Sequence, residues 1–301
     1  MATTDVLLPI EPVSAVPVVR DIEISDLRDA LAKGFDDFWT MPTHLVFLYA
    51  IYPVAGFVIY WTVFAADLIY LLYPLAAGFA LIGPFSAIGL YELSRRRELG
   101  LDTSWSHAFD VFYSPSLVPI LGVGAALMFI FALWIAIAQG LYVATFGYGI
   151  LTPATFVDAL VNEPEGRRLI VVGNVIGFVF AVVAASISVV SLPLLLDRHV
   201  SLAAAVLTSV RVVARNPVVM AVWFVFVALA LFVGSIPAFA GLAVVLPILG
   251  HSTWHLYRKA VEADPGHRPD YEPANRGIRY AADFPSSLFT RSRRPDDGGN
   301  A

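Results

Sequence analysis

The feature that most constrains this chain is the length of its stretches without a charged residue. Five stretches contain no Asp, Glu, Lys or Arg, and they are 38–66, 68–91, 111–157, 169–196 and 216–257. A helix needs about 20 apolar residues to cross the hydrocarbon of a bilayer, which is about 30 Å thick. Each stretch is therefore long enough for at least one crossing.

The composition excludes the main alternatives to a membrane protein. Apolar residues make up 58% of the chain and charged residues only 14%, whereas a soluble chain carries roughly 25% charged residues. The chain has no cysteine, which excludes a disulfide scaffold, and its net charge of −5 argues against a nucleic-acid-binding protein. We therefore expect an all-α integral membrane protein.

The charge-free stretches divide into six predicted spans. Residues 234–237 (Gly-Ser-Ile-Pro) are typical of a turn and split the last stretch into two helices. In the third stretch one strong span is followed by a short helix outside the membrane, which Thr152 caps and Pro153 begins. The predicted spans are 43–65, 69–93, 118–146, 169–195, 217–235 and 239–259.

The basic residues predict the orientation of these spans. With the N-terminus in the cytoplasm, 17 of the 19 Lys and Arg residues fall on the cytoplasmic face, and only Arg167 and Arg168 fall on the other. Eight of the 17 belong to the C-terminal segment, and without them the bias is still nine to two. By the positive-inside rule both termini are cytoplasmic.

A short amphipathic helix is expected before each pair of spans. A serine begins each helix and a proline follows each one, which favours helices over Asp26–Trp39, Trp105–Tyr113 and Leu202–Arg215. Their apolar positions are Leu27, Leu31, Phe35 and Phe38; Trp105, Phe109 and Phe112; and Leu202, Val206, Val210 and Val213. We expect these helices at the cytoplasmic interface, with their apolar sides toward lipid. The predicted fold is thus six transmembrane helices in three hairpins, each preceded by an interfacial amphipathic helix.

The two ends of the chain have a different composition from the middle. Residues 1–24 are rich in proline and acidic residues, and residues 263–301 in Pro, Gly, Arg and Asp. Such segments bury too little apolar surface to fold. We expect a flexible N-terminal lead over 1–24, a membrane domain over 25–262 and a disordered cytoplasmic tail over 263–301.

His251 and His255 are the strongest candidates for a cofactor site. They lie four residues apart on one face of the last span, a spacing that suits metal or haem ligation. A structural site needs further ligands, and His44, His107 and His199 are the other histidines of the predicted cytoplasmic side. The alternative is that His255 anchors the membrane interface and His251 hydrogen-bonds a neighbouring helix. The second interpretation requires less coincidence, so no metal and no cofactor are predicted.

The other polar residues of the spans favour packing over chemistry. We expect Gln139, Asn174, Ser186, Ser188 and Ser191 to hydrogen-bond between helices, and the alternative is that they line a solute path. Two further expectations concern pairs of residues. Gly173 and Gly177 allow close helix packing, and Glu92 and Asp197 pair with Arg95 and Arg198 at the interface rather than relay protons. No catalytic or nucleotide-binding motif is present, so no catalytic residue is predicted.

Several of these motifs resemble a bacterial family of uncharacterised predicted integral membrane proteins. The resemblance rests on Gly78-Phe79 with Gly83-Pro84, residues 89–98 (GLYELSRRRE), Ser114-Pro115-Ser116, Asp197-Arg198 and residues 250–258 (GHSTWHLYR). It covers roughly residues 18–261 and implies a six-span inner-membrane protein with a domain of unknown function. Some members carry a label suggesting cytochrome c oxidase subunit I, whose haem and copper histidine pattern is not seen in this chain.

Three functions are compatible with this sequence. The first is a non-enzymatic role in the assembly, organisation or regulation of other membrane components, whose partners are the lipid bilayer and other membrane proteins or further copies of the chain. The second is a small-solute transporter or channel built from parallel repeats. The third is a haem- or metal-binding redox protein that uses His251 and His255. The absence of a catalytic motif and of an intramembrane acid or base favours the first.

Overall fold

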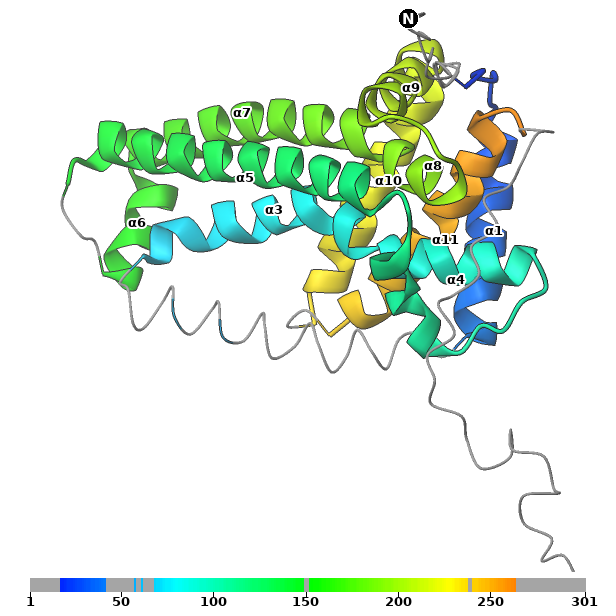
Figure 1. Ribbon diagram of the computed structural model, residues 1–301. Helices are drawn as coiled ribbons and strands as arrows, with labels where there is room; N and C mark the ends of the chain where they lie inside the picture. Colours follow the sequence, from blue (N-terminus) through cyan, green and yellow to red (C-terminus); the bar gives the residue numbers. More distant parts are fainter. Residues whose placement is uncertain are drawn as a thin grey trace, which may run out of the picture. The chain divides into compact units, whose positions relative to one another are not determined.

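The computed structural model describes residues 17–41, 57, 61, 68–148, 152–237 and 240–263. In this part of the chain the regular elements are helices, apart from one isolated antiparallel bridge between Val19 and Val261 (Figure 1). The helices are α1 (Ile24–Thr40), α3 (Ile69–Ser86), α4 (Ile88–Glu98), the 3₁₀ helix η2 (Trp105–Tyr113), α5 (Leu117–Phe146), α6 (Pro153–Asn162), α7 (Pro164–Ser188), α8 (Ser191–Asp197), α9 (Leu202–Arg215), α10 (Pro217–Ser235) and α11 (Leu242–Ala260). The all-α prediction holds for these residues.

Three helical segments of the described chain are long and apolar enough to cross a membrane. They are Leu117–Phe146, Pro164–Asp197 and Pro217–Ser235, and they match the predicted third, fourth and fifth spans. The predicted second and sixth spans correspond to α3 with α4 and to α11. The predicted first span, 43–65, lies outside the described residues except for two positions.

Two of the predicted spans are not single uninterrupted helices. The helix expected over 169–195 is divided at residues 189–190 into α7 and α8. Pro193 has no N–H to donate to the carbonyl of Val189, four residues earlier, which explains the break there. The helix expected over 69–93 is likewise divided at Ala87 into α3 and α4.

The predicted starts of α9 and α6 are correct, and the predicted side chain supplies the cap at each. Ser201 accepts a hydrogen bond from the Ala204 N–H and begins α9, and Thr152 accepts one from the Thr155 N–H and begins α6. Trp105–Tyr113 has its predicted bounds but is a 3₁₀ helix. The predicted start of α1 at Ser25 is wrong, because Glu23 and Asp26 form a reciprocal capping box that begins the helix earlier.

The interfacial helices differ in what their apolar sides contact. Trp105, Phe109 and Phe112 of η2 are exposed, as a lipid-facing side requires. In α1, by contrast, Leu27 and Phe38 are buried. The expectation that the apolar side of α1 faces lipid is therefore wrong for these two residues, because they pack inside the protein.

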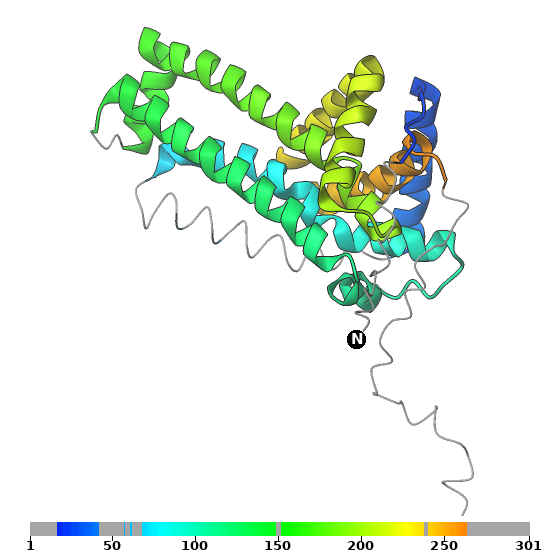
Figure 2. The ribbon, with the colours of Figure 1, turned by 45° about the horizontal axis from the view of Figure 1, so that its top comes forward.

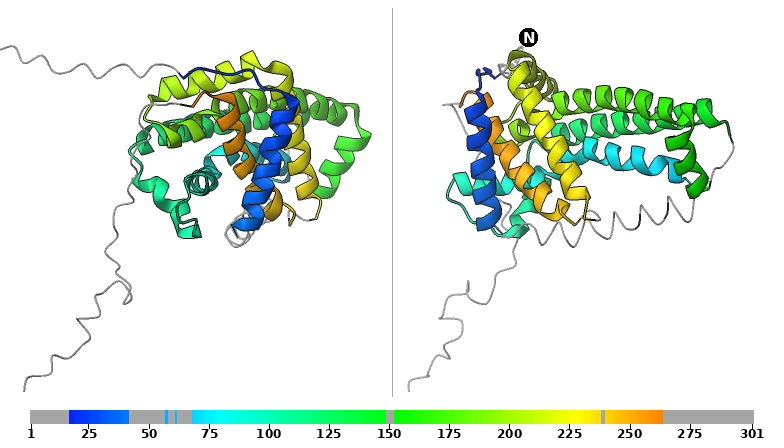
Figure 3. Two further views of the ribbon diagram at one scale, coloured as in Figure 1. Left: turned by 90° about the vertical axis from the view of Figure 1, so that its right-hand side faces the viewer. Right: turned by 180° about the vertical axis from the view of Figure 1, so that it is seen from behind.

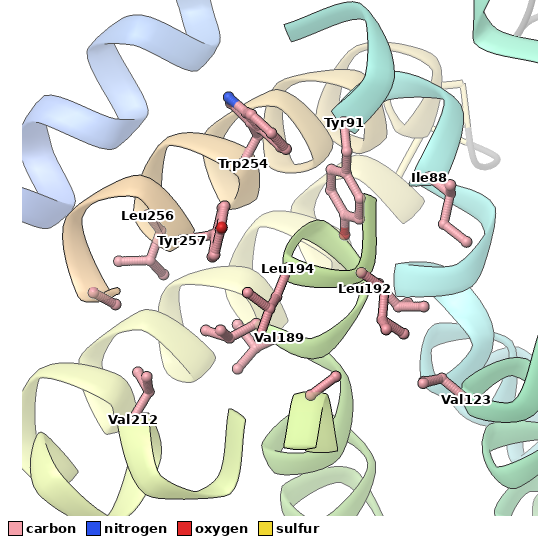
Figure 4. Close-up of a cluster of buried hydrophobic side chains, with 14 of the residues drawn as sticks. Ile88, Tyr91, Val123, Val189, Leu192, Leu194, Val212, Trp254, Leu256 and Tyr257 are labelled. Atoms are coloured by element: carbon pink, nitrogen blue, oxygen red, sulfur yellow. The ribbon is translucent and has the colours of Figure 1, made fainter. Parts of the chain in front are cut away.

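The core forms where α4, α8 and α11 meet. Tyr91 of α4, Leu192 and Leu194 of α8, and Trp254 and Tyr257 of α11 are almost fully buried and belong to one cluster (Figure 4). The segments that end the three predicted hairpins are thus joined in one hydrophobic cluster.

A second layer of packing joins α3, α5 and α7. Trp134 of α5 donates its indole N–H to the carbonyl of Pro74 at 2.9 Å and lies against Phe180 of α7. A Cβ on Gly177 would lie 3.0 Å from the Trp134 ring, so this glycine allows the close approach expected of it. No atom beyond the helix lies near a Cβ built on Gly173. At the far ends of α5 and α7, α6 closes the layer (Figure 2).

Helix α1 lies antiparallel along the second half of α11, as both views in Figure 3 show. The two backbones approach closely at Gly34, where a Cβ would lie 2.6 Å from the Ser252 nitrogen. Just before α1, the Arg20 N–H donates to the Ala260 carbonyl, and the Glu262 N–H donates to the Val18 carbonyl. These hydrogen bonds hold the start of α1 beside the end of α11.

Candidate functional site

The candidate site is a buried polar cluster where α1, α4 and α11 meet. It contains Asp37 of α1, Ser94 and Arg97 of α4, and His251 and His255 of α11. We refer to these five residues as the Asp37 cluster. The glycine contact between α1 and α11 brings the helices close enough for short polar side chains to meet.

Asp37 is the acceptor at the centre of the cluster. Its Oδ2 accepts hydrogen bonds from Ser94 Oγ at 2.6 Å and from His255 Nε2 at 2.9 Å, and its Oδ1 accepts one from Arg97 at 2.5 Å. The carboxylate is only 2% exposed. A buried carboxylate is costly unless it is paired and hydrogen-bonded, and these three donors meet that need.

These donors also determine the protonation of Asp37. Burial raises the pKa of this carboxyl, but the hydrogen bonds from His255, Ser94 and Arg97 and the positive charge near it outweigh burial, so the pKa of Asp37 lies below its ordinary value. Asp37 is therefore ionised at neutral pH. Arg97 strengthens this effect and is itself held by Asp36, 2.7 Å from its second guanidinium nitrogen.

The histidine pair occupies two different environments within the cluster. The His251 ring is fully buried, and its Nδ1 lies 2.7 Å from Ser94 Oγ. A further hydrogen bond joins this ring to the backbone of Leu90. The His255 ring is mostly buried and bonds to Asp37. The prediction that His251 hydrogen-bonds a neighbouring helix agrees with its contact to α4.

A cleft of about 390 Å³ opens beside the cluster. Its lining comes from α1, α4 and α11, and the lining residues are Lys33, Asp36, Asp37, Ser94, Arg97, Glu98, His255, Arg258 and Lys259. On one side of this cleft Glu98 accepts hydrogen bonds from the Trp254 indole and from Arg258. The cleft is therefore bordered by ion pairs that link α4 to α11.

Ion pairs of this kind continue toward α8. Asp197 accepts hydrogen bonds from the Tyr257 hydroxyl at 2.6 Å and from Arg258 at 3.2 Å. Arg198 also lies 3.5 Å from Asp197, as the sequence predicted, but the partners on α11 are closer. The last residue of α8 is thus connected to the end of α11.

A second buried ion cluster lies between α4 and η2. Arg95 pairs with Glu92 at 2.8 Å, which confirms the predicted pair. Arg96 lies 3.6 Å from Asp110, and Asp110 in turn contacts His107 at 2.6 Å. His107 therefore belongs to this cluster and bonds to carboxylates there.

Most of the polar residues predicted within the spans bond inside the protein. Asn174 of α7 accepts a hydrogen bond from the Tyr73 hydroxyl of α3 at 2.7 Å, as expected for an interhelical bond. Ser188 and Ser191 instead donate to carbonyls four residues earlier in their own segment, so the interhelical expectation is wrong for these two. Gln139 and Ser186 are half-buried.

The positions of the possible metal ligands bear on whether His251 and His255 hold a metal or have a structural role. Within the described ranges, no group of three or more His, Asp or Glu side chains is arranged to hold a metal ion. His44 lies outside those ranges. In the Asp37 cluster, the side chain of Asp37 bonds directly to those of Ser94 and His255, which suits a structural contact between helices.

Asp37 is the member of the site that sequence reasoning did not identify. It lies in a short amphipathic helix more than 200 residues before His251, and its neighbours in sequence give no sign of this contact. The available signal is helical spacing, because Asp37 lies three residues after Gly34 and seven after Ala30 on the buried face of α1. Ser94 and Arg97 were noted only as parts of a motif.

Comparison with known proteins agrees with the membrane assignment. Residues 72–197 match the model of a family described as "Predicted integral membrane protein (DUF2189)". The chain is a predicted integral membrane protein. The match runs from within α3 to the end of α8 and confirms the resemblance to a family of uncharacterised membrane proteins. It includes Ser94 and Arg97 but not Asp37 or the two histidines. No curated protein and no solved structure gave a match.

Proposed function

We propose that this chain is a non-enzymatic protein of the bacterial inner membrane that assists the assembly, organisation or regulation of other membrane components. The observation that carries the proposal is the use of the polar side chains as links between helices. Asp37 joins three helices, and Asn174 joins α7 to α3. Catalysis and transport both require polar groups that reach a substrate, whereas an organising protein requires a rigid frame.

The proposed topology has six spans in three hairpins, with both termini in the cytoplasm. The hydrogen bonds between residues 18–20 and 260–262 support it, because they put the two ends of the membrane domain on one side. Such an arrangement needs an even number of crossings. The proposal counts six crossings: three long apolar helices, α3 together with α4 as one, α11, and the predicted span 43–65.

The proposed partners are the lipid bilayer and other membrane proteins, or further copies of the chain, without nucleic acid. The exposed aromatic side chains of η2 support a membrane contact there, because Trp105, Phe109 and Phe112 lie on a helix that follows the basic run Arg95–Arg97. Aromatic and basic residues together are typical of the cytoplasmic interface of membrane proteins.

Three measurements test this function against its alternatives: native gels, solute flux, and the absorption spectrum with the metal content. A strain that lacks the chain should show altered amounts of inner-membrane complexes on native gels, and the wild-type gene should restore them. Purified chain in liposomes should give no more solute flux than empty vesicles. Unchanged complexes together with chain-dependent flux would favour the transporter built from parallel repeats. A Soret band, or metal bound near one equivalent, would favour the redox protein.

A further inference from the structure

The cleft beside the Asp37 cluster carries charges of both signs. Four basic side chains line it (Lys33, Arg97, Arg258 and Lys259), and so do three carboxylates (Asp36, Asp37 and Glu98). Its volume of about 390 Å³ falls in the range of sites for small ligands. A ligand complementary to this lining would carry both a negative and a positive group.

The charged groups differ in whether they are available to a ligand. Asp37 is nearly inaccessible and already accepts three hydrogen bonds. Asp36 and Glu98 have side chains that are 68% and 36% exposed, so a cation can reach them although Asp36 already pairs with Arg97 and Glu98 already accepts hydrogen bonds from Arg258 and the Trp254 indole. Lys33 is exposed, and the side chain of Arg97 is 31% exposed. The accessible charges are therefore two carboxylates and basic groups beside them.

Exposed aromatic rings lie on α1, the helix that contributes Lys33 and Asp36 to the cleft. Phe35 is 47% exposed and Trp39 is 74% exposed, and their ring centroids lie 6.3 Å apart. Phe35 directly precedes Asp36, which lines the cleft. Aromatic side chains of this kind favour the headgroup level of a bilayer. The cleft and these rings together suit a lipid whose headgroup enters the cleft and whose chains stay in the membrane.

We propose that the cleft binds the headgroup of a zwitterionic phospholipid that carries a phosphodiester and a primary ammonium. Lys33 and Arg97 would hold the phosphate, and Asp36 and Glu98 would accept hydrogen bonds from the ammonium. A primary ammonium has three N–H donors, whereas a quaternary ammonium has none, so the cleft should prefer phosphatidylethanolamine to phosphatidylcholine. This inference rests on the proposed placement of α1 at the membrane boundary.

The test measures the unfolding temperature of the purified full-length chain in an uncharged detergent. Short-chain phosphatidylethanolamine, phosphatidylcholine and phosphatidylglycerol are added separately, and inorganic phosphate and ethanolamine are added as soluble controls. Phosphatidylethanolamine should raise the unfolding temperature in a saturable way, and at lower concentration than the other two lipids. Equal effects of the three lipids, or the same rise with inorganic phosphate alone, would overturn the proposal.

Variants of α1 locate the effect in the cleft. Lys33→Ala should raise the concentration of phosphatidylethanolamine needed for half of the effect about fivefold, as expected for one basic residue near a lipid phosphate. Asp36→Ala should remove the preference over phosphatidylcholine. Arg28→Ala, on the same helix but away from the cleft, is the matched control and should keep both. Unchanged lipid binding in Lys33→Ala and Asp36→Ala would contradict the assignment.

The outcome of this test is separable from that of the proposed function. The native-gel phenotype of a strain without the chain does not depend on which headgroup the cleft prefers. A negative lipid test with an intact phenotype overturns only the headgroup site. A positive lipid test without a phenotype supports the site and overturns the organising role.

Discussion

Asp37→Asn is the substitution that most directly tests how the described helices are held together. The new side chain has nearly the same shape but no charge, and its amide nitrogen cannot accept hydrogen bonds. The amide N–H therefore faces either Arg97, at the position of Oδ1, or Ser94 and His255 together, at the position of Oδ2. The variant should weaken the joint between α1, α4 and α11 without creating a cavity.

The size of the effect follows from the burial of the group. Removal of one partner of a buried ion pair costs about 3–5 kcal/mol, because the other charge stays buried. The remaining charge here is Arg97, whose side chain is 31% exposed and which still pairs with Asp36 at 2.7 Å. We therefore expect a loss of about 2–3 kcal/mol, close to that of one or two hydrogen bonds to a charged group. This corresponds to a fall in unfolding temperature of about 4–10 °C.

Thermal unfolding in detergent, followed by circular dichroism, measures this fall. Asp29→Asn makes the same chemical change on the same helix, at an exposed carboxylate that pairs with Lys259 at 3.1 Å. An exposed pair of that kind contributes about 0–1 kcal/mol, so this control should unfold close to the wild-type temperature. If Asp37→Asn and Asp29→Asn unfold at the same temperature, the Asp37 cluster does not hold the helices together.

The remaining expectations concern helix contacts, pH and the histidines. Gly34→Ala should destabilise the fold by about 1–3 kcal/mol, because its Cβ would lie 2.0 Å from a side-chain oxygen of α11. The Cβ of Gly173→Ala meets nothing within 4 Å, so this variant should instead stabilise the fold by up to about 1 kcal/mol. Equal unfolding temperatures for the two variants would refute the close contact at Gly34. The pKa of Asp37 lies below its ordinary value, so its contribution to stability is complete above the pKa of the unfolded chain, about 4, and is lost as the pH falls through the lower folded pKa. Wild type should therefore lose stability below about pH 4 more steeply than Asp37→Asn, and parallel curves would contradict this. The double variant His251→Ala, His255→Ala should keep the absorption spectrum and metal content of the wild type and unfold at a lower temperature; loss of a chromophore or of a bound metal would show that the pair holds a cofactor.

The sequence predicted those elements whose signals are local. Ser201 and Pro217 delimit α9 at its observed bounds, because a side-chain cap and a proline act within a few residues. The pair Glu92 with Arg95 was also predictable, since the two residues are three apart on one helix. Long apolar segments predicted α5 and α10 for the same reason.

Features that depend on contacts distant in sequence were not predictable in this way. Asp37 meets α11 more than 200 residues later, and periodicity within α1 does not distinguish a side that faces lipid from one that packs on another helix. The break at residues 189–190 reflects the cost of Pro193, which hydropathy alone does not report. Local pattern thus predicts the helices, whereas their packing decides the site.

Reporter fusions give the most direct test of the account as a whole, because the proposed role depends on the topology. The proposed six spans leave the two ends of the membrane domain on one side, where residues 18–20 and 260–262 hydrogen-bond to each other. A reporter fused after Ala263 should therefore be active only in its cytoplasmic form, and a reporter at Glu163, between α6 and α7, should be active only when exported. An exported reporter at Ala263, or a cytoplasmic one at Glu163, would contradict the six-span topology.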